Sequence, residues 1–205
     1  MDNYVVDHSH GVIQIHIPKT AGTTIRSLFC PSMPTDRYMH LKPDHPRNVK
    51  HWDRFFSFTF TRNPWDRLVS CYKFCFTSPT GQQFNRDVYE KHPDFKTFVM
   101  DWLNEYNIQT ISRFEPQINW VINRDNNKSF GIDYIGKIEY LRKGVWYIID
   151  RLRLQDLYDF ELPHINQGGN SIPYMDFYDD ETREKVAKLY QDDIKLFGYI
   201  FEGVK

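Results

Sequence analysis

The chain has 205 residues, which is long enough to bury one sizeable hydrophobic core, and we expect a single domain over residues 1–205. Its hydrophobic content of 40% and aromatic content of 17% are those of a globular protein and exclude a disordered chain. A formal net charge of -1 excludes a general attraction to nucleic acid, so any anion-binding site must be local.

The amino-terminal sequence and the cysteines bear on the compartment. Residues 1–17 (MDNYVVDHSHGVIQIHI) hold no basic cluster before their short apolar stretch, unlike a signal peptide. No stretch approaches the roughly 20 apolar residues of a membrane span. Three cysteines, Cys30, Cys71 and Cys75, cannot all pair internally and show no metal-ligand spacing. We therefore expect a cytoplasmic protein with reduced thiols and no membrane partner.

The first half of the chain predicts two strands, each followed by a helix. Residues 11–17 form a short, mostly apolar run, which is typical of a strand buried on both faces. Residues 20–30 predict a tight turn that opens into a helix. Residues 55–61 (FFSFTFT) alternate aromatic with small hydroxyl side chains, which predicts a second strand. Pro64 suits the first position of the next helix, predicted over 65–76.

The second half predicts one more strand among helices. Residues 132–136 (IDYIG) predict this third strand. Apolar residues at helical spacing predict helices over 94–106 and 139–154. We also expect a short helix over 115–123 and a final helix over 179–197. Three segments rich in Pro, Gly or polar residues predict loops: 31–54, 77–93 and 163–178. This alternation predicts an α/β fold with a mainly parallel sheet flanked by helices, and ligands in such sheets bind at the carboxyl ends of the strands.

The turn after the first predicted strand has the composition of an anion-binding loop. A helix start supplies N–H groups and the favourable end of the helix dipole, and Lys19 adds a full positive charge. Gly22 lets the backbone approach an anion closely, and threonine hydroxyls add donors. We predict a phosphate or sulfate cradle made of Lys19, Thr20, Ala21, Gly22, Thr23 and Thr24. A plain helix entry with a good cap is the alternative interpretation.

The cradle is not the loop of nucleotide triphosphatases. In that motif a lysine follows two spaced glycines, whereas here Lys19 precedes Gly22 and no second glycine stands upstream at the required spacing. This order argues against a kinase.

The turn after the second predicted strand suits a second phosphate group. Arg62 ends that strand, and Ser70 lies about two turns into the following helix. A guanidinium forms a fork of hydrogen bonds to a phosphate, and a serine hydroxyl adds one more. In the alternative interpretation, Arg62 caps a carbonyl group and Ser70 only packs the helix.

Taken together, the two turns resemble a known signature. HIPKTAGTT, followed some forty residues later by FTFTRNPWDRLVSCY, is similar to the two-part motif of carbohydrate sulfotransferases, which act on chondroitin, dermatan and heparan chains and have microbial and viral relatives. That motif binds 3′-phosphoadenosine 5′-phosphosulfate (PAPS). The later segments YIGKIEYL, LPHINQ and VAKLYQDDIKLFGY resemble the third core strand and the carboxy-terminal region of the same family.

The resemblance implies a P-loop-like parallel sheet, PAPS as the donor and adenosine 3′,5′-bisphosphate as the product. The segment from Lys19 to Thr24 would bind the 5′-phosphosulfate, and Arg62 and Ser70 would bind the 3′-phosphate. The acceptor would be a hydroxyl group, expected on a saccharide.

Sulfuryl transfer needs a cation near the leaving phosphate oxygen and a base for the acceptor hydroxyl. Lys19 is our candidate for the first task, and we expect no metal. Histidine, with an unperturbed pKa of roughly 6.5, is the usual base. His40 is the first candidate because related enzymes place a histidine in this region. The alternatives are His45, His51, Asp44 and Glu115.

The remaining polar candidates receive lesser roles. His16 and His164 are interpreted as structural, whereas Asn166 and Ser171 could touch the nucleotide. We predict a PAPS-dependent sulfotransferase that acts on a carbohydrate hydroxyl. The alternatives are a non-catalytic nucleotide- or phosphate-binding module and a small P-loop kinase. The sequence specifies neither the acceptor nor the oligomeric state.

Overall fold

The computed structural model of the chain describes residues 4–7, 11–29, 54–77, 88, 90–123, 126–153 and 172–204. The chain divides into two compact units, the first made of Met1–Arg62 and Asn119–Gly169 and the second of Asn63–Ile118 and Asn170–Lys205. Our expectation of a single domain stays a prediction. None of the helices in the described part of the chain is long and apolar enough to span a bilayer.

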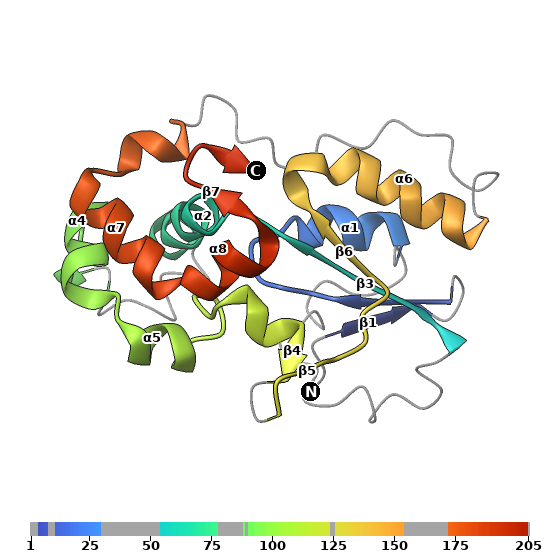
Figure 1. Cartoon of the computed structure of the whole chain (residues 1–205). Coiled ribbons are helices and arrows are strands. Elements are labelled where there is room, and N and C mark those ends of the chain that lie inside the picture. The colour runs from blue at the N-terminus through green and yellow to red at the C-terminus, as the bar shows by residue number, and fades with distance from the viewer. Residues whose placement is uncertain are drawn as a thin grey trace. The chain divides into compact units, whose positions relative to one another are not determined.

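Figure 1 shows the helices and strands and labels most of them. The strands are β1 (Tyr4–Asp7), β2 (Val12–Ile15), β3 (Phe56–Thr61), β4 (Ile122–Asn123), β5 (Lys128–Ser129), β6 (Tyr134–Lys137), β7 (Tyr199–Ile200) and β8 (Gly203–Val204). The α-helices are α1 (Gly22–Phe29), α2 (Pro64–Thr77), α4 (Phe95–Thr97), α5 (Glu105–Thr110), α6 (Leu141–Leu152), α7 (Asp180–Leu189) and α8 (Gln191–Phe197). A π-helix covers Phe98–Trp102, and short 3-10 helices cover Gln117–Trp120, Ile138–Tyr140 and Tyr174–Phe177.

The first unit is built on a sheet with the strand order β1-β2-β3-β6. Strands β2, β3 and β6 run parallel, and β1 pairs antiparallel with β2. The α/β prediction of a parallel sheet flanked by helices is therefore confirmed. Strand β1 was not among the predicted elements.

Alternation along β3 sorts its side chains onto the two faces of the sheet. Phe58 and Phe60 are fully buried on the face that α1 and α6 cover together (Figure 1). The hydroxyl residues point to the opposite face, where Thr59 Oγ1 donates to the Ile15 carbonyl over 2.7 Å and Thr61 Oγ1 donates to the Gly136 carbonyl over 3.2 Å. Each such hydrogen bond contributes about 0.5–1.5 kcal/mol and offsets the desolvation of a buried hydroxyl.

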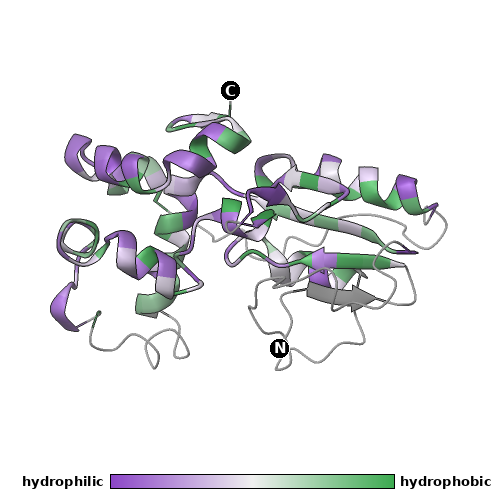
Figure 2. Ribbon diagram, turned by 60° about the horizontal axis from the view of Figure 1, so that its bottom comes forward, coloured by the Kyte–Doolittle hydropathy of each residue, from purple (hydrophilic) through white to green (hydrophobic). Residues whose placement is uncertain are grey.

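Helix α6 has one buried and one exposed face, as its helical spacing of apolar residues predicts. Val145, Ile148 and Ile149 are buried, and the ribbon of α6 alternates between hydrophobic and hydrophilic residues in Figure 2. Gly144 packs directly against the Phe60 ring. A Cβ atom added to Gly144 would lie only 2.6 Å from a carbon of that ring. Close packing on the sheet thus explains the glycine within this helix.

The second unit is organised around α2. This helix begins at Pro64, as predicted, and buries Trp65, Leu68 and Tyr72 among aromatic side chains. Asn63 caps it, since Asn63 Oδ1 accepts a hydrogen bond from Trp65 N over 3.1 Å.

Two helices predicted as continuous are interrupted in the structure. The 94–106 segment forms α4 and the π-helix and then stops at Leu103, and Asn104 caps α5 as a new helix. The 179–197 segment breaks at Tyr190, whose buried hydroxyl donates to the Phe114 carbonyl over 2.6 Å. In both places a cap or a tertiary hydrogen bond overrides a hydrophobic period that continues through the break.

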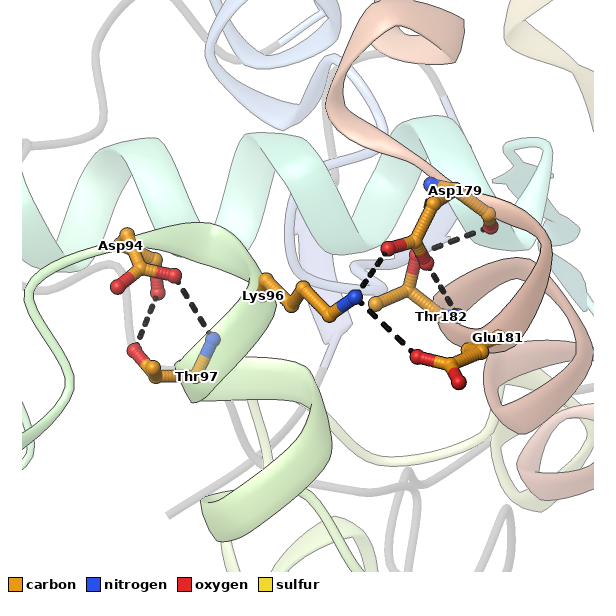
Figure 3. Close-up of polar contacts among 6 residues, drawn as sticks. All are labelled: Asp94, Lys96, Thr97, Asp179, Glu181 and Thr182. Atoms are coloured by element: carbon orange, nitrogen blue, oxygen red, sulfur yellow. Dashed lines mark hydrogen bonds and ion pairs between the residues drawn. The ribbon is translucent and has the colours of Figure 1, made fainter.

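An exposed ion-pair cluster joins α4 to the start of α7 (Figure 3). Lys96 Nζ lies 2.6 Å from an Asp179 carboxylate oxygen and 3.2 Å from one of Glu181. Asp179 also caps α7 by accepting the Thr182 N–H over 2.9 Å. The hydrogen bond from Lys96 lowers the pKa of the Asp179 carboxyl, and in return the carboxylate raises the pKa of Lys96.

Candidate functional site

Strands β2 and β3 are parallel neighbours, so the turns that follow them lie at the same edge of the sheet. Ile13 pairs with Ser57 and Gln14 pairs with Phe58 in this register. Residues 16–21 then connect β2 to α1, while β3 ends next to Arg62. The predicted cradle and the predicted arginine are thus brought to one place by the topology of the sheet.

The sign of φ alternates along the backbone of the cradle. Lys19 has φ of 69° and Ala21 has φ of 62°, whereas Thr20 between them and Gly22 after them do not have positive φ. Residues with left-handed φ next to residues without it can turn successive N–H groups toward a common point, and such backbone nests bind anions. Left-handed backbone costs a non-glycine residue about 1–3 kcal/mol, and such strain is concentrated at functional sites.

Hydrogen bonds within the loop hold this conformation. The Thr20 side chain is buried, and its Oγ1 donates to the Ile17 carbonyl over 2.8 Å. Helix α1 then begins, with Ile25 N donating to the Ala21 carbonyl over 3.1 Å. Thr24 is buried and Thr23 is exposed on the first turn of α1. The Thr20 hydroxyl therefore stabilises the loop, and its hydrogen is donated to the Ile17 carbonyl instead of to a ligand.

Arg62 reaches the cradle from the end of β3. Its Nη1 donates to the backbone carbonyl of Lys19 over 3.2 Å, and both side chains are half-buried. Two positively charged residues thus lie together at the carboxyl edge of the sheet. In this position they can neutralise the charge of a phosphate or sulfate group.

Gly22 has a second neighbour besides the loop backbone. The imidazole of His16, which is buried directly after β2, occupies the space where a side chain of residue 22 would lie. From the sequence, Gly22 is expected to admit an anion and His16 is interpreted as structural. The structure places the two residues against each other under the cradle.

The other predicted site residues are distributed as follows. Ser70 is half-buried on α2 in the second unit. Glu115, also in the second unit, is buried and its backbone carbonyl accepts a hydrogen bond from Arg67 Nη1 over 2.9 Å. The remaining candidates lie outside the described residues: His40, Asp44, His45, His51, His164, Asn166 and Ser171.

A buried polar cluster in the second unit was not predicted. Asp193 is fully buried on α8 and accepts the N–H groups of Gln117 and Ile118, both over 2.8 Å. Burial raises the pKa of the Asp193 carboxyl, and the two N–H donors together with the charge of Arg67 act against that rise. Aspartate in an amphipathic helix is expected on the exposed face. The sequence pattern therefore does not indicate that Asp193 is buried and accepts backbone N–H groups.

Helix α2 carries two cysteines. Cys71 and Cys75 are both buried, and neither forms a disulfide. Within the part of the chain that the structure describes, there is no group of three or more His, Cys, Asp or Glu side chains placed to hold a metal ion.

Comparison with known proteins places the sequence in a family. Carbohydrate sulfotransferase 12 of Xenopus laevis is 23% identical to the chain, over an alignment that covers 97% of the chain and 60% of that relative. The chain thus spans well under two thirds of the relative's length. No solved structure gives a significant match. The model of the sulfotransferase family matches residues 2–200, which is nearly the whole sequence, and the chain therefore belongs to the sulfotransferase family.

Proposed function

We propose that this protein transfers a sulfuryl group from PAPS to a hydroxyl group of a carbohydrate acceptor. Family membership supports the reaction type, and the name of the Xenopus laevis relative supports a carbohydrate as the acceptor. The observation that carries the proposal is the alternating backbone at Lys19 and Ala21 with the Arg62 guanidinium beside it. This arrangement suits a ligand with two anionic groups, one held by the N–H groups of the cradle with Lys19 and the other by Arg62.

In the proposed complex, the cradle holds the 5′-phosphosulfate of PAPS. Successive N–H groups of residues 19–24 would surround its oxygens, and the Lys19 ammonium would neutralise the charge that develops on the leaving phosphate oxygen. Thr20 would contribute its N–H group, because its hydroxyl donates to the Ile17 carbonyl. Gly22 starts α1, so the favourable end of the helix dipole adds to the field.

Arg62 and Ser70 are the proposed ligands of the 3′-phosphate. A guanidinium has five N–H donors in a planar fork, and one of those of Arg62 donates to the Lys19 carbonyl. A ligand with an anion at each end would explain why arginine follows one strand while lysine follows the neighbouring one. This feature favours PAPS over a donor with a single phosphate chain.

His40 is the proposed general base for the acceptor hydroxyl, with His45, His51, Asp44 and Glu115 as alternatives. In a transfer without a metal, the base takes the proton of the hydroxyl as the acceptor oxygen bonds to sulfur, and the bond from sulfur to the phosphate oxygen breaks. The products are the sulfated acceptor and adenosine 3′,5′-bisphosphate.

Two measurements test this proposal. In the first, calorimetric titration compares adenosine 3′,5′-bisphosphate with ATP, each with and without magnesium. We expect tighter binding of the bisphosphate and no dependence on magnesium, whereas tighter, magnesium-dependent binding of ATP would favour a small kinase.

In the second measurement, radiolabelled PAPS is incubated with a panel of saccharides, and the Lys19→Ala variant serves as the control. Label on a saccharide with the wild type alone supports the proposed function. Bisphosphate binding without transfer to any saccharide, tyrosine or small alcohol would favour a non-catalytic binding module.

A further inference from the structure

A histidine ring lies where a side chain of residue 22 would have to be. A Cβ atom built on Gly22 would be 1.9 Å from His16 Nε2, 2.3 Å from Cδ2 and 2.6 Å from Cε1. Each separation is far below the distance at which nonbonded atoms attract one another. The edge of the imidazole therefore lies directly against Gly22, and no other residue type fits there while the ring is present.

Backbone conformation does not explain the glycine. Gly22 lacks a positive φ and is the first residue of α1, so its backbone conformation is one that other residue types also adopt. The three atoms nearest to a Cβ built at this position all belong to the His16 ring, so this ring requires glycine there.

The contact between His16 and Gly22 connects the start of the cradle loop to its end. His16 directly follows β2 and Gly22 opens α1, so the ring bridges the two ends of the loop. Between them lie Lys19 and Ala21, whose left-handed backbone persists only where the surroundings hold it. Two hydrogen bonds hold the first part of the loop, one from the Thr20 hydroxyl to the Ile17 carbonyl and one from the Arg62 guanidinium to the Lys19 carbonyl. The His16 ring contacts the end of the loop at Gly22.

We propose that His16 is a positioning residue, which sets the start of α1 by its contact with Gly22 and so aims the N–H groups of the cradle at the bound anion. The inference deepens the proposed function and rests on it, because the anion is that of the proposed donor. His16 acts through the loop, and the residue is only 6% exposed.

The test is a double-mutant cycle on the full chain, with His16→Ala, Gly22→Ala and the double variant. Two readouts are the dissociation constant of adenosine 3′,5′-bisphosphate and the hydrogen exchange of the peptide that covers residues 19–24 in the protein without nucleotide. We expect each single substitution to weaken binding about tenfold or more, since loss of one held backbone conformation has a cost of this order. Adding Gly22→Ala to His16→Ala should change the dissociation constant by less than about threefold, because the clash is then gone.

Gly144→Ala is the matched control. A Cβ at Gly144 meets the Phe60 ring at 2.6 Å, so this variant also crowds an aromatic ring within the first unit, but on α6. We expect a lower Tm, an unchanged dissociation constant for the folded protein, and no relief when His16→Ala is added. His16→Asn, which removes the ring and keeps a polar side chain, replaces His16→Ala if that variant does not fold.

The outcomes separate this inference from the proposed function. Faster exchange of residues 19–24 in His16→Ala and relief of Gly22→Ala in the double variant support the positioning role. An equally damaging Gly22→Ala in both backgrounds, or a Tm loss with unchanged exchange of the cradle, overturns it. If the wild type binds no bisphosphate, the proposed function fails, and hydrogen exchange in the same four proteins still decides the role of His16.

Discussion

The Arg62 guanidinium donates a hydrogen bond to the backbone carbonyl of Lys19 over 3.2 Å, so the end of β3 is tied to the cradle that follows β2. The two residues are 43 positions apart in the sequence. Parallel pairing of the two strands brings them to one edge. Arg62 thus has two proposed tasks, to hold the left-handed conformation of Lys19 and to bind a phosphate.

Replacing Arg62 by alanine removes both the hydrogen bond to the Lys19 carbonyl and the proposed contact with the phosphate. Hydrogen bonds to charged groups contribute about 1.5–3 kcal/mol, which predicts that adenosine 3′,5′-bisphosphate binds about 10- to 150-fold more weakly to Arg62→Ala. Arg62→Lys keeps the charge without the planar fork and should bind with intermediate affinity. Calorimetric titration measures both, and the exposed Arg54→Ala is the control with expected wild-type affinity. Wild-type affinity in Arg62→Ala would remove this residue from the site.

Lys19 combines a charge with a strained backbone, and two substitutions separate these properties. Both Lys19→Ala and Lys19→Gly remove the ammonium, and we expect kcat to fall about 10²- to 10³-fold in each. Only glycine adopts φ of 69° without penalty, so Lys19→Gly should be more stable than Lys19→Ala by about 1 kcal/mol. Steady-state kinetics and urea unfolding measure the two effects, and Lys143→Ala on the exposed face of α6 is the control. Equal kcat in the wild type and Lys19→Gly would contradict the catalytic assignment.

The sequence was informative where local chemistry decides the structure. β-branched residues predicted β2, the alternation in FSFTFT predicted β3, and Pro64 marked the first residue of α2. The residue types in the cradle predicted its position between a strand and a helix. Left-handed backbone at Lys19 and Ala21 could not be predicted, because non-glycine residues rarely adopt it and only tertiary contacts hold it.

Tertiary partners also explain the elements that the sequence analysis misjudged. The helix predicted over 179–197 breaks at Tyr190, where the hydroxyl reaches the Phe114 carbonyl, and α8 then presents Asp193 to the N–H groups of Gln117 and Ile118. The apolar spacing continues through this break, so periodicity alone predicts one helix. Partners about 75 positions away in the sequence leave no local signal.

Asp193 gives a prediction on pH. Because burial raises the pKa of its carboxyl above the unfolded value of about 3.9, its contribution to stability is fully present below that value and is lost as the pH rises through the folded pKa. An asparagine at this position cannot titrate, so the stability of the wild type relative to Asp193→Asn should decrease with rising pH in that window. Asp193→Ala leaves two buried N–H groups without an acceptor and should lower the free energy of unfolding by about 1–3 kcal/mol for each.

Urea unfolding of the wild type, Asp193→Asn and Asp193→Ala between pH 3 and pH 8 measures this behaviour. The exposed Glu184→Gln, on the adjacent helix α7, controls for the general effect of removing an acidic group. Parallel pH curves for the wild type and Asp193→Asn would show that the carboxyl does not titrate differently on folding.

The ion-pair cluster at Lys96 predicts the opposite pH trend. Its hydrogen bond lowers the pKa of Asp179, so this contribution is present above the unfolded value of about 3.9 and is lost as the pH falls toward the folded value. Lys96→Met should lower Tm slightly at pH 7, and the difference should shrink in acid and in high salt because the cluster is exposed. Thermal unfolding followed by circular dichroism measures it, with the exposed Lys91→Met as the control. A difference in Tm that is the same in high salt, about 1 M, would point to lost packing instead of lost charge.

The general base is tested by separating binding from chemistry. If His40 takes the proton from the acceptor hydroxyl, His40→Ala should lower kcat about 10²- to 10⁴-fold and leave the affinity for adenosine 3′,5′-bisphosphate unchanged, because the base faces the acceptor and not the nucleotide. For the wild type, kcat/KM should rise with pH through the ionisation of a histidine, near a pKa of about 6.5, and His40→Ala should lose this rise. His45→Ala and His51→Ala are matched controls from the same segment. A pH dependence that survives in His40→Ala and disappears in one of these two variants would transfer the role to that histidine, while its survival in all three would favour a carboxylate base at Asp44 or Glu115.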